Sequence, residues 1–218
     1  ETFRTYVKEN IDTTADGILS KTEREQVTEI NVSSKEISDL TGVEYFTALK
    51  ELYCGGNNLT ELDVRQNTEL QKLYCYNNQL KELDVRQNPA LQILGCNDNQ
   101  LKELDVHQNS ALQELHCYNN NLTELNVCQN TELQTLWCSN NNLTVLDVRQ
   151  NTALQVLYCY NNNLTELDVR QNTALHLLYC YNNNLTALDL SQNPELTSLA
   201  CSNNTYSIAL TGGTFDLS

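Results

Sequence analysis

A chain of 218 residues with 28 acidic and 13 basic side chains carries a formal net charge of −15. This excess of acid argues against nucleic acid and anionic membrane surfaces as partners, because both attract basic patches. No apolar run is long enough to predict a transmembrane helix. Methionine and an apolar N-terminal segment are both absent, so we expect that any signal peptide has been removed.

Residues 1–26 lie outside the repeats that fill the rest of the chain. Phe3, Tyr6 and Val7 have the spacing of the apolar stripe of a short helix. Ser20 and Glu23 have the spacing of a capping box, which predicts a second helix that runs toward residue 27. The segment is therefore predicted to be a small helical cap.

The loop between these helices follows the calcium-loop template D-x-[DN]-x-[DN]-G-x5-E. The template places the ligands at Asp12, Thr14, Asp16, Ile18, Ser20 and Glu23. Thr14 departs from the template because its hydroxyl brings no charge, so the prediction is a weakened calcium site that stabilises the cap. A plain turn at Asp16 and Gly17, followed by the capping box, is the alternative interpretation.

From Val27 onward the sequence repeats with a period of 21 residues. A degenerate first copy covers residues 27–48, regular copies cover residues 49–195, and a fading copy covers residues 196–218. In the fading copy Tyr206 replaces a leucine. Self-similarity at such a period predicts a solenoid, in which each turn packs on its neighbours.

The first half of each repeat has the spacing L-x-x-L-x-C-x-x-N-x-L, first seen in residues 49–59. Leu52 and Cys54 are predicted to point inward from a short strand, and Asn57 to turn the chain. The second half, residues 59–67, repeats the same spacing with valine in place of cysteine. We therefore predict two short parallel strands per turn, which face each other across a thin core with little helix.

Eight of the nine cysteines share one register of the repeat. They are Cys54, Cys75, Cys96, Cys117, Cys138, Cys159, Cys180 and Cys201. Because this register requires a buried apolar side chain, we expect free buried thiols that pack as small hydrophobes. Cys128 stands in a column otherwise held by arginine and is predicted to be exposed.

Two outward columns of the first strand hold eight of the eleven tyrosines and the single tryptophan. Their aromatic and imidazole members are Tyr53, Tyr74, Tyr76, His116, Tyr118, Trp137, Tyr158, Tyr160, Tyr179 and Tyr181. Such a strip is either a stacked ladder that stabilises the fold or a binding surface for a protein or a sugar. Gly95 and Asn97 interrupt it, which predicts a dent.

The outward columns of the second half are charged, with eleven acids and four arginines in their regular positions. Most of this face is interpreted as a solvated, partly salt-bridged surface that discourages aggregation of sheets. A cation-binding or basic-partner surface is the alternative. The histidines, His107, His116 and His176, fall in different columns, and no known catalytic motif or phosphate loop is present, so no enzymatic activity is predicted.

These motifs together resemble the bacterial leucine-rich repeat family, in its nested class of 21-residue repeats. The N-terminal segment resembles the EF-hand-like cap of secreted bacterial surface proteins. The resemblance implies a right-handed leucine-rich repeat solenoid that acts as a secreted or surface-attached, non-enzymatic binding scaffold and is a monomer. A protein partner on the aromatic columns is the first hypothesis. A carbohydrate on the same columns, and a passive stalk of a larger protein, are the alternatives.

Overall fold

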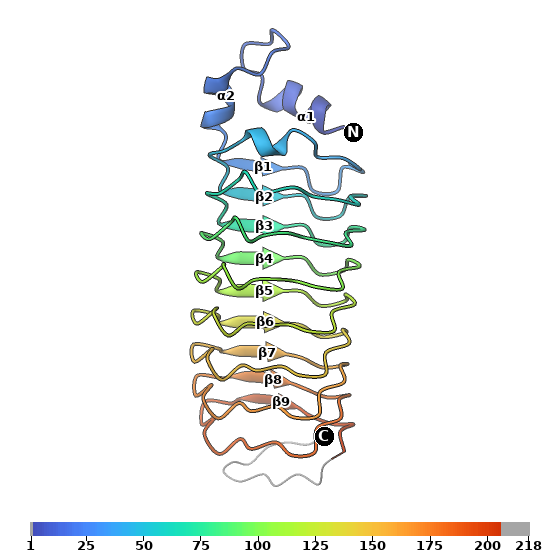
Figure 1. Cartoon of the computed structure of the whole chain (residues 1–218), viewed down its shortest axis with the longest axis vertical. Helices are drawn as coiled ribbons and strands as arrows, with labels where there is room; N and C mark the ends of the chain where they lie inside the picture. Colours follow the sequence, from blue (N-terminus) through green and yellow to red (C-terminus); the bar gives the residue numbers. More distant parts are fainter. Residues whose placement is uncertain (1, 206–218) are drawn as a thin grey trace.

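The computed structural model describes residues 2–205; residue 1 and residues 206–218, including Tyr206 and most of the fading repeat, lie outside the described part. The chain winds into an elongated stack of turns, with two helices at its N-terminal end (Figure 1). The helices are α1 (Phe3–Asn10) and α2 (Lys21–Gln26), and a 3-10 turn, η1, covers Val43–Tyr45. The strands are β1 (Glu29–Asn31), β2 (Glu51–Tyr53), β3 (Lys72–Tyr74), β4 (Ile93–Gly95), β5 (Glu114–His116), β6 (Thr135–Trp137), β7 (Val156–Tyr158), β8 (Leu177–Tyr179) and β9 (Ser198–Ala200).

The strands form one parallel sheet in which sequence order and spatial order are the same. Each strand pairs in register with the next, so that Leu52 lies beside Leu73 and Leu73 lies beside Leu94. Residues 21 positions apart therefore occupy equivalent places in successive turns. The predicted leucine-rich repeat solenoid is confirmed.

The core of each turn is built from the leucine, cysteine and valine positions of the repeat. In the turn that contains β6, they are Leu133, Leu136, Cys138, Leu143 and Val148, each fully buried (0% exposed). The neighbours of the inward leucine on the strand point outward, as alternation along a strand requires. No disulfide joins the nine cysteines, all of which lie among the described residues, and burial raises the pKa of Cys75 to about 12. Cys128, predicted to be exposed, is half-buried.

One column of asparagines joins successive turns at the end of each strand. The Asn99 amide donates to the carbonyl of Cys96 in its own turn (3.1 Å) and to that of Cys75 in the preceding turn (3.0 Å). Its Oδ1 accepts the backbone N–H of Leu80, also in the preceding turn (3.0 Å). A single side chain thus satisfies three buried backbone groups that the turn would otherwise leave unpaired.

A second column of asparagines also joins successive turns, on the opposite side of the turn, through its amide N–H groups alone. The Asn130 amide donates to the carbonyls of Val106 (3.0 Å) and Asn109 (2.8 Å), both in the preceding turn. Asn130 is fully buried, and its own backbone closes two local turns, with Val127 and Leu133. The same contacts recur in each regular turn.

The second half of each repeat contains no strand within the described residues, so the prediction of two strands per turn is wrong. Local hydrogen bonds occupy the backbone N–H and C=O groups that pairing between strands would need. Asp63 accepts the backbone N–H of Arg65 (3.0 Å), and the N–H of Asn67 donates to the carbonyl of Val64 (3.0 Å). Aspartate and asparagine compete in this way with ladder formation. The solenoid therefore has one sheet and one extended, non-strand side.

The N-terminal segment covers the first turn of the solenoid, as predicted for a helical cap. Figure 1 shows α1 and α2 above β1, at the end of the stack. Phe3 and Ile11 are buried, and the Phe3 ring meets the edge of Phe46 at a centroid distance of 6.3 Å. The apolar core is thereby closed to water at this end, as a solenoid requires.

We predict that Asn130→Ala lowers the free energy of unfolding by about 2–4 kcal/mol, because two buried carbonyls lose their donor. Urea denaturation followed by circular dichroism measures this change. The matched control is Gln129→Ala, an exposed amide beside it, which should change stability by less than about 0.5 kcal/mol. Equal effects of the two substitutions would contradict the bridging role of the buried amide.

Candidate binding site

The outer face of the sheet carries the aromatic side chains that the sequence predicted to lie together. We call this surface the aromatic strand face. It comprises Tyr53, Tyr74, Tyr76, His116, Tyr118, Trp137, Tyr158, Tyr160, Tyr179 and Tyr181. In-register pairing of the strands places each of them one strand spacing from its counterpart in the next turn.

The rings contact one another along the long axis of the solenoid, some stacked and some tilted. His116, Trp137, Tyr158 and Tyr179 form a continuous row, with successive centroid distances of 4.8, 5.0 and 4.8 Å. Beside this row, Tyr160 and Tyr181 stack at 4.6 Å with their planes 6° apart. Such contacts fix each ring before any partner arrives, so less side-chain entropy is lost on binding.

The dent predicted at Gly95 and Asn97 is absent from the described structure, because neighbouring side chains fill it. A Cβ atom at Gly95 would lie 2.9 Å from Cδ1 of Tyr74, so the Tyr74 ring occupies the space above the glycine. Asn97 is buried and its amide donates to the carboxylate of Asp98 (2.7 Å). Where Gly95 interrupts the aromatic columns, the Tyr74 ring therefore packs closely on the glycine and no hollow remains.

A third outward column, the residue before each inward leucine, was missed by the sequence analysis. Strict alternation along the strand would have revealed it. It reads Glu51, Lys72, Ile93, Glu114, Thr135, Val156, Leu177 and Ser198. From β6 to β8 all three columns are uncharged, and we call this region the β6–β8 patch. It consists of Thr135, Trp137, Ser139, Val156, Tyr158, Tyr160, Leu177, Tyr179 and Tyr181.

A slot of about 320 Å³ opens in the β6–β8 patch. It arises because Ser139 stands where the neighbouring turns have Tyr118 and Tyr160, so one ring is missing from the column. The rings of Trp137, Tyr158 and Tyr179 complete its lining together with these two tyrosines. Within the described part of the chain, Nε1 of Trp137 is buried and has no hydrogen-bond partner.

The part of the face nearer the N-terminus is charged. The Tyr53 hydroxyl donates to Glu51, and Lys72 pairs with the same carboxylate at 3.0 Å. The hydrogen bond to Glu51 raises the pKa of Tyr53 to about 12, so this tyrosine is neutral at pH 7. Burial lowers the pKa of His116, which stacks on Trp137. Charged groups therefore occur on this face before β6 and are absent from the β6–β8 patch.

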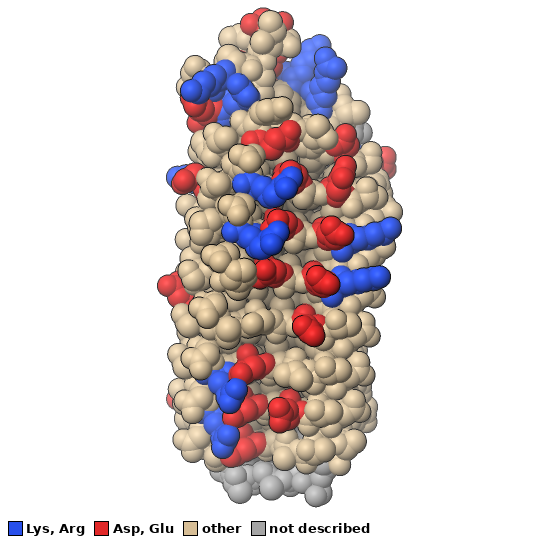
Figure 2. Space-filling model, viewed as in Figure 1, with Lys and Arg blue, Asp and Glu red and all other residues tan. Residues whose placement is uncertain are grey.

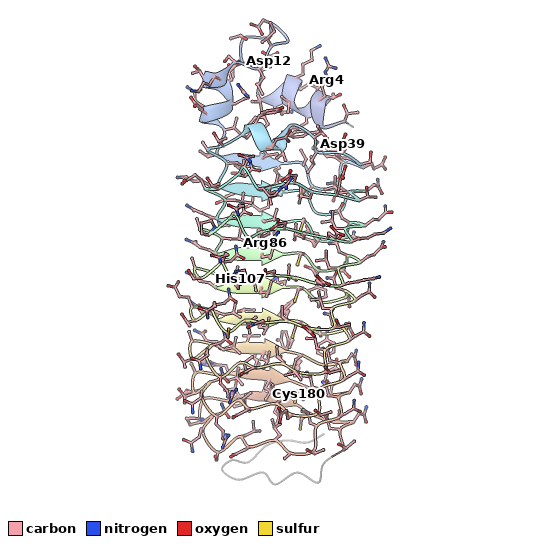
Figure 3. All side chains as sticks on the ribbon, in the orientation of Figure 1. Arg4, Asp12, Asp39, Arg86, His107 and Cys180 are labelled. Atoms are coloured by element: carbon pink, nitrogen blue, oxygen red, sulfur yellow. The ribbon has the colours of Figure 1, made fainter. Side chains whose placement is uncertain are left out.

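The opposite side of the solenoid is lined with paired charges. Each regular arginine forms a two-bond ion pair with the aspartate two residues earlier, as for Arg86 and Asp84 (2.8 and 2.9 Å). The pair holds the pKa of Asp84 at about 2. Figure 2 shows these columns of acids and bases side by side, and Figure 3 shows Arg86 and His107 in successive turns. The partly salt-bridged surface that the sequence predicts is confirmed, and most of its cations are already paired.

The N-terminal loop is held by hydrogen bonds to its own carboxylates. Glu23 accepts from the backbone N–H of Thr13 (2.9 Å) and Thr14 (3.2 Å) and from the Ser20 N–H (2.9 Å). The Glu23 N–H in turn donates to the Ser20 hydroxyl, which confirms the predicted capping box.

The remaining predicted ligands of this loop also form hydrogen bonds within it. Asp12 accepts from the Gly17 N–H (2.9 Å), Asp16 accepts from the Ile18 N–H (2.8 Å), and Thr14 donates to Asp12 (3.3 Å). Across residues 2–205, no group of three or more acidic, histidine or cysteine side chains is close enough to hold a metal ion. The loop is ordered by its own contacts, and calcium there stays a prediction.

Two stretches, residues 68–109 and 131–172, match the family described as leucine-rich repeats (2 copies). Internalin J of Listeria monocytogenes serotype 4b is 42% identical over 68 residues, which are 31% of this chain and 7% of that protein. No helix among the described residues has the length and apolar character needed to cross a bilayer. The chain thus carries leucine-rich repeats similar to those of a Listeria internalin.

Solved structures extend this similarity over most of the described chain. The functional domain of InlJ from Listeria monocytogenes, which includes a cysteine ladder, matches with a TM-score of 0.70 at 38% identity over 85% of this chain and 46% of that one. A leucine-rich repeat protein of Leptospira interrogans matches with a TM-score of 0.76 at 28% identity over 86% and 53%. Internalin C2 of Listeria monocytogenes has a TM-score of 0.77 at 17% identity over 95% and 92%, which shows the fold alone. The chain spans about half of each of the first two structures.

The hydrogen bonds to Glu23 predict a pH dependence of the cap. Bonds from Ser20 and Thr13 lower the pKa of Glu23 from 4.5 to about 2. A lowered pKa in the folded state contributes stability above the unfolded pKa, and this contribution is lost as the pH falls from 4.5 toward 2. Glu23→Gln should therefore lower the Tm of the cap at pH 7 and match the wild type near pH 2. The control is Glu25→Gln, an exposed residue of α2; a constant difference from pH 7 to pH 2 would contradict the prediction.

Proposed function

We propose that this chain is a non-enzymatic binding scaffold that recognises a protein partner through the aromatic strand face, as part of a secreted or cell-surface protein. The observation that carries the proposal is the β6–β8 patch, a continuous uncharged surface of aromatic and aliphatic side chains on an otherwise acidic molecule. Exposed apolar surface of this kind on a single chain marks interaction sites. Tyrosine and tryptophan are also the residues that most often dominate binding energy at protein interfaces.

The geometry of the sheet suits a protein partner. Nine strands at a spacing of about 4.8 Å give a face of about 38 Å in length, enough for a standard interface of about 800 Å² per partner. The rings of Trp137, Tyr158 and Tyr179, on β6–β8, contact one another and supply anchors for a partner. The charged groups near Tyr53 on β2 and His116 on β5 lie outside the β6–β8 patch, where they would affect the rate of association and specificity.

The comparisons support this assignment through similarity to internalin J and to the functional domain of InlJ. The net charge of −15 disfavours nucleic acid and anionic lipid as partners. We propose that the chain acts as a monomer, because within the described residues each regular turn already pairs both edges of its strand and α1 and α2 cover the first turn. A passive stalk would have no need of a patch in which aromatic and aliphatic side chains gather over three successive turns.

A carbohydrate ligand on the same surface is the second candidate. The slot beside Ser139 has aromatic walls and a volume of about 320 Å³, a size suited to one sugar ring. Flat tyrosine faces and a serine hydroxyl are compatible with such a ligand. A glycan array separates the candidates, since a protein-specific face gives no saturable binding to polysaccharides.

We predict that replacing Tyr158 and Tyr179 by alanine weakens binding of a purified protein partner by at least about tenfold, because two buried anchors are lost. The partner is first isolated on the immobilised chain from a surface-protein extract and then purified, and its Kd is measured by calorimetry. The matched control replaces Glu82 and Glu103, on the opposite side of the solenoid, by alanine and should leave the Kd unchanged. Unchanged affinity with an intact fold in the tyrosine variant would rule out this face.

We propose that the N-terminal loop binds calcium weakly, with Asp12, Thr14, Asp16, Ile18, Ser20 and Glu23 as the ligands that the template assigns. Calcium at about 100 times its Kd would add about 2.7 kcal/mol to the stability of the cap. A thermal melt with calcium and with a chelator measures the shift. The variant Asp12→Asn, at the position where the template requires aspartate, should abolish the shift. An identical Tm of the wild type in both conditions would contradict calcium binding by this loop.

A further inference from the structure

We infer that the partner segment held at the slot beside Ser139 is proline-rich and basic, and that it lies along the long axis of the solenoid, toward the N-terminal turns, in the polyproline II conformation. This inference rests on the proposed function and names the chemistry of its partner. It follows from the spacing of one column of the aromatic strand face, from the slot beside Ser139, and from the distribution of charge on the sheet.

The column two residues beyond each strand alternates between a tyrosine and a smaller side chain from β3 to β7, where it reads Tyr76, Asn97, Tyr118, Ser139 and Tyr160. Tyr181, beyond β8, ends this alternation. Over these five turns a tyrosine therefore recurs every second turn, a distance of about 9.6 Å at a strand spacing of about 4.8 Å. Three residues of a polyproline II helix advance about 9.3 Å. Between β3 and β7, every third residue of such a helix would thus meet a tyrosine of this column.

The slot beside Ser139 fits one proline ring of that helix. Ser139 is 2% exposed and forms the floor, while Tyr118 and Tyr160 form walls two turns apart. The Trp137 and Tyr158 rings, 5.0 Å apart and tilted by 53° to each other, provide an apolar side. Proline brings an apolar ring without a backbone donor, so its burial leaves no N–H unsatisfied.

The indole of Trp137 offers the polar contact. Its buried Nε1 lacks an acceptor, and an unpaired buried donor costs about 1–3 kcal/mol. The carbonyl groups of a polyproline II helix make no internal hydrogen bonds and point outward. Because Nε1 is buried, the rings around the slot have to shift before a carbonyl beside the bound proline accepts from it.

Charge favours a basic end of the segment directed toward the N-terminal turns. The β6–β8 patch is uncharged, whereas Glu114 on β5 has a side chain that is 43% exposed. Asp98 lies one turn earlier, beside the Asn97 position, and is half-buried. Together with the net charge of −15, these carboxylates attract lysine or arginine and repel an acidic segment.

The single tryptophan makes occupancy directly measurable, because Trp137 lines the slot. The probe is a synthetic peptide of about twelve residues with proline at every third position and arginine at one end. A peptide of the same composition with the prolines clustered at one end is the control, and cellohexaose and chitohexaose represent carbohydrates. We expect saturable quenching or shift of tryptophan emission with the periodic peptide, and at least about tenfold weaker binding of the other probes.

Ser139→Tyr tests the slot itself. Tyrosine already occupies this column at 118 and 160, so the substitution completes the column and should fold. We expect the Kd of the labelled periodic peptide, measured by fluorescence anisotropy, to rise at least about tenfold. Ser202→Tyr makes the same change in the same column away from the slot and should have no effect.

Absence of saturable binding of the periodic peptide, equal binding of the clustered peptide, or wild-type affinity in Ser139→Tyr would each overturn the inference. A response to the oligosaccharides alone would assign the slot to carbohydrate. If a purified protein partner loses affinity on replacement of Tyr158 and Tyr179 while the peptide never binds, the proposed function stands and this inference fails.

Discussion

Stacking of nearly identical turns in register is the constraint on which the rest of the molecule depends. The backbone ladder of β1–β9 accounts for one side of each turn, and buried asparagine amides secure the remainder. Asn99 and Asn130 each join their own turn to the preceding one, at opposite sides of the core. A shift of one residue in any turn would break these contacts and expose the leucines together. The strict 21-residue period is therefore a structural requirement as well as a record of duplication.

This constraint explains how much could be predicted from the sequence. Once the period is recognised, the 21-residue spacing predicts which residues stack on one another. It thereby predicts the inward leucines and cysteines, the aromatic strand face and the paired charges. The capping box at Ser20 and Glu23 is equally local and was predicted from two residues. The solenoid follows from a repeat and the N-terminal cap from a short-range pattern. In both cases the spacing of residues in the sequence determines where they lie in space.

The errors arose where side chains compete with the backbone or with one another. The second half of the repeat has the spacing of a strand, yet Asp63 and Asn67 satisfy the backbone locally and no second sheet forms in the described chain. Gly95 suggested a dent, but the Tyr74 ring turns into that space. The slot at Ser139 escaped notice because it depends on the directions of five surrounding rings, which the pattern of residues alone does not determine.

The two sides of the solenoid therefore differ in what they leave available to a partner. On the extended side, Arg149 already forms a two-bond ion pair with Asp147, and Asp63, Asp84 and Asp168 are matched in the same way. A partner there would have to break these pairs and desolvate both charges, with little net gain. In the β6–β8 patch of the sheet side a partner meets no ion pair that it would have to break, and Nε1 of Trp137 has no hydrogen-bond partner in the described chain. Binding energy is therefore available on the sheet side, where Ser139 interrupts the column of tyrosines and leaves a slot.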